Sequence, residues 1–164
     1  MIGYLQGTPR ISGTTLLVIT GGVGYQVFAG QAVFDKARSS TSIELYIYTH
    51  VKEDALELFG FLGQQQKEIF ELLLSVSGVG PKTALALSEL GSESISRAVQ
   101  EADVSAFSAV PRVGKKVAQK IIIELKSKLG SLRDLSLASD VGPIGDVREA
   151  LESLGFSDRD IDSV

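Results

Sequence analysis

Two short segments, 34 residues apart, carry glycine, valine and lysine at matching positions. They are Val76-Ser77-Gly78-Val79-Gly80-Pro81-Lys82 and Val110-Pro111-Arg112-Val113-Gly114-Lys115-Lys116. Each lies between apolar stretches with helical spacing, so each predicts a helix, a tight glycine turn and a second helix. The N–H groups that begin such a second helix favour a phosphate, and the nearby lysine adds positive charge. This chemistry holds a nucleic-acid backbone and does not read its bases.

Other glycine motifs fit these segments poorly. A Walker A loop needs glycine directly before Lys and Ser or Thr, whereas Pro81 separates Gly80 from Lys82. A Rossmann fingerprint would place glycine where Thr83 stands, after a strand. Two copies whose identity is concentrated at the turn do not make a helical solenoid. A pair of helix turns with a purely structural role is the alternative to a phosphate-binding pair.

The distribution of charge supports phosphate binding, although the chain as a whole is acidic. The 164 residues include 16 Lys and Arg against 20 Asp and Glu, a formal net charge of -4. Residues 110–128 hold six cations and one carboxylate, whereas residues 129–164 hold three cations and eight carboxylates. The acidity therefore belongs mainly to the C-terminal part, and a basic patch surrounds the second turn.

The residue types exclude several classes of function. Without Cys, and with His50 as the single histidine, the chain lacks the groups for thiol catalysis, disulfides, thiolate zinc sites and histidine clusters. We predict no catalytic site, no metal and no cofactor. No segment approaches the roughly 18 apolar residues of a membrane span, and the N-terminus has no secretory signal. These features predict a soluble cytoplasmic protein without membrane contact.

The first 62 residues have the composition and spacing of β-strands. The predicted strands cover residues 1–7, 14–20, 23–28, 42–52 and 55–61. Gly21-Gly22 predicts a two-residue hairpin turn, and the alternation of Ile43, Leu45 and Ile47 with other residues is typical of a strand with one buried face. Five short strands favour a small closed barrel, and the oligonucleotide-binding (OB) fold is the commonest five-stranded form.

After the strands, the spacing becomes helical and predicts about five short helices. Pro81 suits the first turn of one helix, Ser92 can cap the next, and Gly130 can end the last. Residues 131–143 have the Ser, Asp, Gly and Pro of a linker. Residues 144–164 hold two partial helices, which are too few to close a core, so we expect the chain to stop inside a domain.

Four further segments bear on the family. They are Met1-Ile2-Gly3-Tyr4-Leu5-Gln6-Gly7, Gly21-Gly22-Val23-Gly24-Tyr25, Lys52-Glu53-Asp54-Ala55-Leu56-Glu57-Leu58-Phe59-Gly60-Phe61 and Leu72-Leu73-Leu74-Ser75-Val76-Ser77-Gly78-Val79-Gly80-Pro81-Lys82. Together they resemble the bacterial RuvA family of Holliday-junction branch-migration proteins, over residues 1 to about 130.

The resemblance implies a multidomain α+β fold. Its expected parts are an OB-fold barrel over residues 1–62, a tandem helix-hairpin-helix domain over 63–130, a flexible linker over 131–143 and an incomplete UBA-like three-helix domain over 144–164. In the family, the C-terminal domain contacts the RuvB ATPase.

The resemblance also implies a function. It is the binding of four-way junction DNA by structure and not by sequence, by a homotetramer or by an octamer of two tetramers. The implied partners are the RuvB ATPase and the RuvC resolvase, in recombination, DNA repair and the SOS response to DNA damage. Because the chain has no Walker A motif, the ATPase motor must be a partner, and we predict a non-catalytic subunit. The alternative is a general helix-hairpin-helix and OB DNA-binding module, or a subunit of a DNA-repair enzyme, without junction specificity.

Residue roles follow from the same resemblance. The phosphate-contacting positions of the family fall on Gly78, Gly80, Lys82, Gly114, Lys115, Lys116 and Lys120. Glu53 and Asp54 match an acidic pin near the junction centre, where carboxylates would repel phosphates and help keep the strands apart. From the residues alone, this pair is equally a solvated turn between two strands. His50 is expected to be an ordinary strand residue.

Arg112 is a departure from the family, which usually has glycine at this position. If the position needs a positive φ, arginine costs about 1–2 kcal/mol and reshapes the loop. Alternatively, the guanidinium reaches a phosphate and offsets the strain. Arg112 therefore belongs to the predicted DNA-binding residues, either as a strained position or as a phosphate contact.

Overall fold

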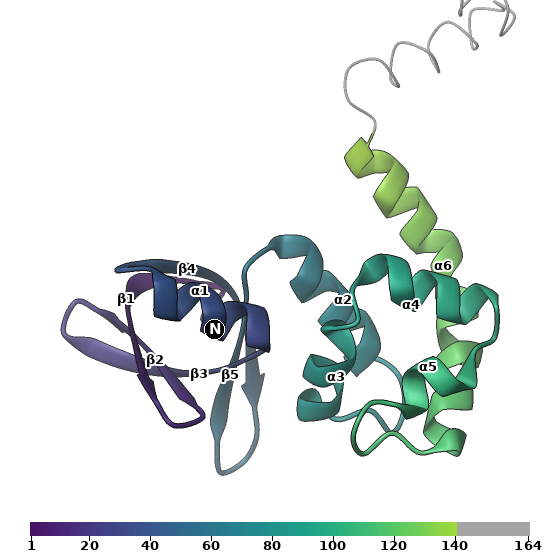
Figure 1. The fold of residues 1–164 in the computed structure, drawn as a ribbon, viewed down its shortest axis with the longest axis horizontal. Coiled ribbons are helices and arrows are strands. Elements are labelled where there is room, and N and C mark those ends of the chain that lie inside the picture. Colours follow the sequence, from purple (N-terminus) through teal and green to yellow (C-terminus); the bar gives the residue numbers. More distant parts are fainter. Residues whose placement is uncertain (141–164) are drawn as a thin grey trace, which may run out of the picture. The chain divides into compact units, whose positions relative to one another are not determined.

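A computed structural model describes the backbone of residues 1–140 and the side chains of residues 1–128 (Figure 1). Its elements are β1 (Tyr4–Ser12), β2 (Thr15–Thr20), β3 (Val23–Ala29), α1 (Gln31–Ser39), β4 (Ile43–Val51), β5 (Leu56–Phe61), α2 (Gln64–Leu74), α3 (Pro81–Ser88), α4 (Ser92–Gln100), α5 (Val104–Ser108) and α6 (Lys115–Asp140). Residues 1–126 form one compact unit, and a second unit begins at Ser127.

The five strands close into a barrel in the order β1-β2-β3-β5-β4. Strands β3 and β5 pair in parallel, and the other neighbours are antiparallel. The turn between β2 and β3 has φ values of +56° at Gly21 and +80° at Gly22, which glycine adopts without strain. The predicted five-stranded OB-type barrel and its glycine hairpin are confirmed.

Alternating side chains of the strands fill the barrel. In β4, Ile43, Leu45 and Ile47 are buried, as the spacing predicts. The strand pattern of residues 1–62 does not predict helix α1. Its buried residues Val33 and Ala37, one helical turn apart, join the barrel core. Their spacing was the available signal, but a helix of nine residues gives a weak pattern.

The segment after the barrel contains the expected five helices, α2 to α6. Pro81 occupies the first turn of α3, as predicted. The predicted cap at Ser92 is wrong, because Gly91 precedes α4 with φ +81° and Ser92 lies within the first turn. Gly91 adopts this backbone conformation more easily than serine.

The predicted end of the last helix at Gly130 is also wrong. Helix α6 continues to Asp140 and thus occupies most of the predicted linker. A single glycine costs a helix only about 1 kcal/mol relative to alanine, and several leucines follow it. Residues 141–143 of the predicted linker and the predicted C-terminal domain, 144–164, lie outside the described residues. The proposed domain boundaries stay predictions.

Aromatic rings join the barrel to the helices that follow it. Phe59 of β5 and Phe70 of α2 are fully buried, and their rings stack with centroids 5.3 Å apart. Tyr48 of β4 and Phe61 of β5 also contact Phe70, with centroid distances of 5.2 and 5.0 Å. Helix α2 therefore shares a core with the end of the barrel, which places the turn after α2 beside the barrel.

Candidate nucleic-acid interface

The two repeated segments form the same turn. In the first, the Val79 N–H donates to the Val76 carbonyl oxygen at 3.1 Å, and Ala84 N–H donates to Gly80 at 2.8 Å. In the second, the corresponding distances are 3.1 Å for Val113 to Val110 and 2.9 Å for Ala118 to Gly114. The sequence repeat is therefore also a structural repeat, with α2 and α3 around one turn and α5 and α6 around the other.

Buried side chains anchor each turn to the helices. The four valines at the turns and the two alanines one turn into the following helices are all buried. They are Val76, Val79, Val110, Val113, Ala84 and Ala118. The residues between the valines of each turn face solvent, and so do Gly80, Gly114 and the lysines that follow them. Each turn thus presents its polar backbone outward from a rigid base.

Gly78 and Arg112 occupy equivalent positions and both have a positive φ, +92° and +71°. Position 112 therefore does need a positive φ, and the backbone strain at Arg112 amounts to about 1–2 kcal/mol. Arg112 is exposed, and no residue in the described part of the chain forms an ion pair with it. A contact between its guanidinium and a phosphate stays a prediction.

Gly80 and Gly114 differ from Gly78, because the fold itself does not require them. Neither has a positive φ, and a Cβ atom at either position would meet no neighbouring atom of the described residues within 4 Å. Glycine is also used where a ligand must approach the backbone closely. These residues directly precede α3 and α6, whose first turns contain no acidic residue. The open backbone and the uncompensated positive helix ends suit an anion.

Exposed lysines follow both turns. Lys82 follows the first turn, and Lys115 and Lys116 begin the helix after the second. Lys120, one turn further along α6, is 3.8 Å from Glu124 in an ion pair. Glu124 also accepts a hydrogen bond of 3.3 Å from the backbone N–H of Ser77. This hydrogen bond joins α6 to the first turn, between residues 47 positions apart, and the sequence does not predict it.

Lys82 also faces the barrel. Its ammonium nitrogen lies 4.9 Å from the ring centroid of Phe28 in β3. Nearby, Lys52, which directly follows β4, forms an ion pair with Glu57 of β5, with Nζ and Oε2 2.8 Å apart. The hydrogen bond from Lys52 is the main cause that holds the pKa of Glu57 below its usual range, and the charge of Lys82 contributes further. Sequence reasoning did not identify Phe28 or Glu57, since both contacts depend on tertiary packing.

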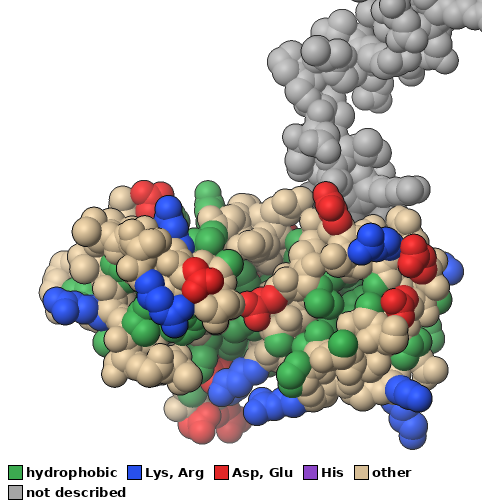
Figure 2. Space-filling model, in the orientation of Figure 1, with side chains coloured by type: hydrophobic (Ala, Val, Ile, Leu, Met, Phe, Trp, Pro, Cys, Tyr) green, Lys and Arg blue, Asp and Glu red, His purple; other side chains and the backbone are tan. Residues whose placement is uncertain are grey.

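Glu53 and Asp54 lie in the turn that joins β4 to β5, and both are exposed. The Lys52 N–H donates to the Ala55 carbonyl oxygen at 2.8 Å and closes this turn. The β4–β5 hairpin extends away from the barrel in Figure 1, and acidic side chains gather at its tip in Figure 2. The predicted position in an exposed turn between two strands is confirmed, and the role of an acidic pin stays a prediction.

His50 is a half-buried residue of β4, as expected. Its ring lies 6.4 Å from that of Tyr48 and 6.5 Å from that of Phe59. Within the described residues, no group of three His, Cys, Asp or Glu side chains could hold a metal ion. None of the described helices has the length and apolar character that crossing a membrane requires.

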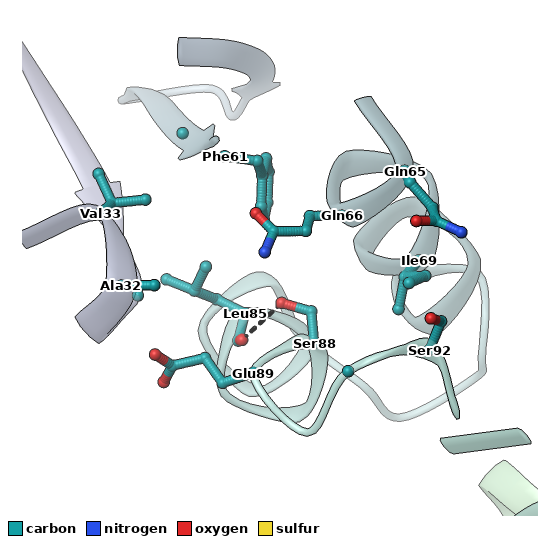
Figure 3. A pocket seen from close by; sticks show the side chains of 13 residues that line it. Ala32, Val33, Phe61, Gln65, Gln66, Ile69, Leu85, Ser88, Glu89 and Ser92 are labelled. Carbon is teal, nitrogen blue, oxygen red and sulfur yellow. Dashed lines mark hydrogen bonds between the residues drawn. The ribbon is translucent and has the colours of Figure 1, made fainter. Parts of the chain in front are cut away.

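A cavity of about 260 Å³ lies elsewhere, between α1, the end of β5 and helices α2 to α4 (Figure 3). Gln65, Gln66 and Glu89 supply polar groups to its wall, and the Ser88 hydroxyl donates to the Leu85 carbonyl oxygen at 2.7 Å. Glu89 also accepts the backbone N–H of Gln31, at the start of α1. No predicted phosphate-contacting residue lines this cavity, so it is separate from the repeated turns.

A closed five-stranded barrel followed by two equivalent glycine turns between helices defines a protein of the OB and helix-hairpin-helix class. Family models agree, since one for a SAM-like helix-hairpin-helix tandem matches residues 70–127 and one for the RuvA N terminal domain matches residues 1–60. The chain belongs to the RuvA family, because relatives of that family are well above 30% identical over nearly its whole length.

Three of these relatives carry the name Holliday junction branch migration complex subunit RuvA. The protein of Laribacter hongkongensis (strain HLHK9) is 38% identical over 99% of this chain and 88% of its own length. That of Marinomonas sp. (strain MWYL1) is 37% identical, with coverages of 98% and 86%. That of Symbiobacterium thermophilum is 39% identical, with coverages of 96% and 83%.

Proposed function

We propose that this chain is a non-catalytic subunit that binds four-way junction DNA by its shape. Family membership supports the proposal, since the relatives are named as subunits of a Holliday junction branch migration complex. The chain would hold the junction, and the RuvB ATPase would supply the motor for branch migration in recombination and repair. A homotetramer, or two stacked tetramers, would match the four arms of the junction with four equivalent copies.

The observation that carries the proposal is the structural repeat with open glycines and exposed cations at both turns. The proposed phosphate contacts are Gly78, Gly80, Lys82, Arg112, Gly114, Lys115, Lys116 and Lys120. Contacts to phosphates from backbone N–H groups and lysines do not depend on the bases, which suits a ligand defined by shape. Two turns in each chain let several weak contacts act together on one junction.

The acidic hairpin supports the same ligand. Glu53 and Asp54 would repel phosphates where the arms meet, while the basic turns attract phosphates further out along each arm. A cytoplasmic location and contact with the RuvC resolvase belong to this proposal as well, and they rest on family membership.

The experiment replaces both Lys82 and Lys116 with alanine and measures binding to a four-way junction over a range of salt concentrations. Each lost phosphate contact should reduce the slope of log K against log salt by about 0.9. The matched control replaces Arg10 and Arg97, which are exposed and lie outside the turns, and changes net charge equally. An unchanged slope for the lysine pair, or an equal loss for the control pair, would contradict the assignment of the turns.

A general DNA-binding module or a DNA-repair enzyme subunit is the alternative function. It would use the same turns, so the lysine variants alone do not separate it from the proposal. Equal binding of junction and linear duplex would favour the alternative.

A further inference from the structure

A fixed aromatic surface of the barrel lies beneath one cation of the candidate interface. Lys82 follows the first glycine turn, and its ammonium nitrogen is 4.9 Å from the ring centroid of Phe28. The Phe28 ring in turn stacks on Phe59, with centroids 5.3 Å apart and planes inclined by 27°. Because Phe59 is fully buried in the core shared with α2, the ring beneath Lys82 has little freedom to move.

An aromatic face attracts an ammonium group without accepting its hydrogen bonds in the way a carboxylate does. The ammonium has three N–H donors, and the ring attracts it through its quadrupole. Among the described residues, no carboxylate forms an ion pair with Lys82. Lys82 is therefore held in place while it stays exposed and able to donate to an anion.

The position of Lys82 also links the first turn to the base of the acidic hairpin. Glu57 lies in β5, two residues before Phe59, and its carboxylate pairs with Lys52 at 2.8 Å. Lys82 acts on this carboxylate through its charge. Glu57 forms its ion pair with Lys52, whereas the Lys82 ammonium lies over the Phe28 ring.

We propose that Phe28 is a positioning residue for DNA binding, whose ring holds the Lys82 ammonium where it meets a phosphate at the first glycine turn. The barrel thereby contributes to phosphate binding through a residue that does not itself contact DNA. A long lysine side chain that is already placed loses less conformational freedom when the phosphate binds. This inference rests on the proposed function for the identity of the ligand.

The test is a double-mutant cycle on DNA affinity with Phe28→Leu and Lys82→Ala. Phe28→Leu removes the aromatic face and keeps an apolar side chain, and should weaken binding about two- to fivefold for each engaged turn. Phe28→Tyr keeps the face and should retain wild-type affinity. In the Lys82→Ala background, Phe28→Leu should have no further effect.

A matched control is available in Phe34, whose ring lies 5.9 Å from Arg38 Cζ in α1, away from the turns. Phe34→Leu removes a comparable contact and should leave DNA affinity unchanged. Thermal unfolding of each variant checks that it is folded, and Phe28→Met replaces Phe28→Leu in the cycle if the latter does not fold.

Three outcomes would overturn the proposal. Phe28→Leu could weaken binding equally with and without Lys82, which would indicate a structural role only. It could leave binding unchanged, or it could strengthen binding, which would mean that the ring competes with DNA for the lysine. The cycle is run on both the junction and a linear duplex. Equal affinity for the two DNAs would count against the proposed function, and the coupling between Phe28 and Lys82 could still be measured.

Discussion

Replacement of Arg112 by glycine should raise the stability of the protein and weaken its binding to DNA. The residue has φ +71°, at the position where the first turn has Gly78. Relief of the left-handed conformation is worth about 1–2 kcal/mol. The greater freedom of glycine in the unfolded chain offsets about 0.4–1 kcal/mol of this gain. The net gain is about 1 kcal/mol, which raises the Tm of a unit of this size by about 3–5 °C.

The effect on DNA binding has the opposite sign, because the guanidinium is lost. If Arg112 contacts one phosphate, the slope of log K against log salt should fall by about 0.9 for each chain engaged. Backbone strain at an exposed cationic residue is expected where that residue binds a ligand and does not stabilise the fold.

The assay pairs thermal unfolding with salt-dependent binding to a four-way junction, at one protein concentration because oligomer formation shifts Tm. Arg112→Ala is the matched variant, since alanine loses the charge but keeps the strained backbone. It should reduce the salt slope as glycine does, without the gain in Tm. An equal Tm gain for alanine would refute the strain argument, and an unchanged salt slope for both variants would refute the phosphate contact.

Two other predictions concern the turns and their support. The variants Gly80→Ala and Gly114→Ala should leave Tm nearly unchanged, because the added methyl group meets no neighbouring atom of the described residues within 4 Å. Both should weaken junction binding in a gel shift, and unaltered binding would contradict close approach of a ligand. The Asp103 carboxylate caps α5 by accepting the N–H groups of Ser105 and Ala106 at 2.9 and 3.3 Å, and its pKa is lowered chiefly by the Ser105 side-chain hydrogen bond. This stabilisation is present above the ordinary carboxylate pKa and is lost as pH falls through the lowered value. Asp103→Ala should therefore lower Tm at neutral pH, with a difference that disappears in acid; a difference independent of pH would contradict the cap.

The sequence predicted features that depend on local patterns. The alternation of Ile43, Leu45 and Ile47 identified β4, and the Gly21-Gly22 pair identified the turn that precedes β3. The repeat identified both phosphate-binding candidates, since a glycine turn with buried valines on either side is a local unit.

Features that depend on tertiary packing could not be predicted. Helix α1 has only two buried residues, so its sequence pattern is weak and tertiary packing stabilises it. The contact of Lys82 with Phe28 and the hydrogen bond of Ser77 with Glu124 join residues that are about 50 positions apart. Helix α6 continues past the predicted end at Gly130, because the favourable helical sequence on both sides outweighs one glycine.

The preference for a branched DNA shape is the central claim, and one comparison tests it most directly. It is the affinity of the chain for a four-way junction and for a linear duplex with the same base sequence, measured side by side at the same salt concentration. The repeated turns, engaging several arms at once, predict tighter binding to the junction than to the duplex at every salt concentration. Equal affinity for the two DNAs would contradict the claim.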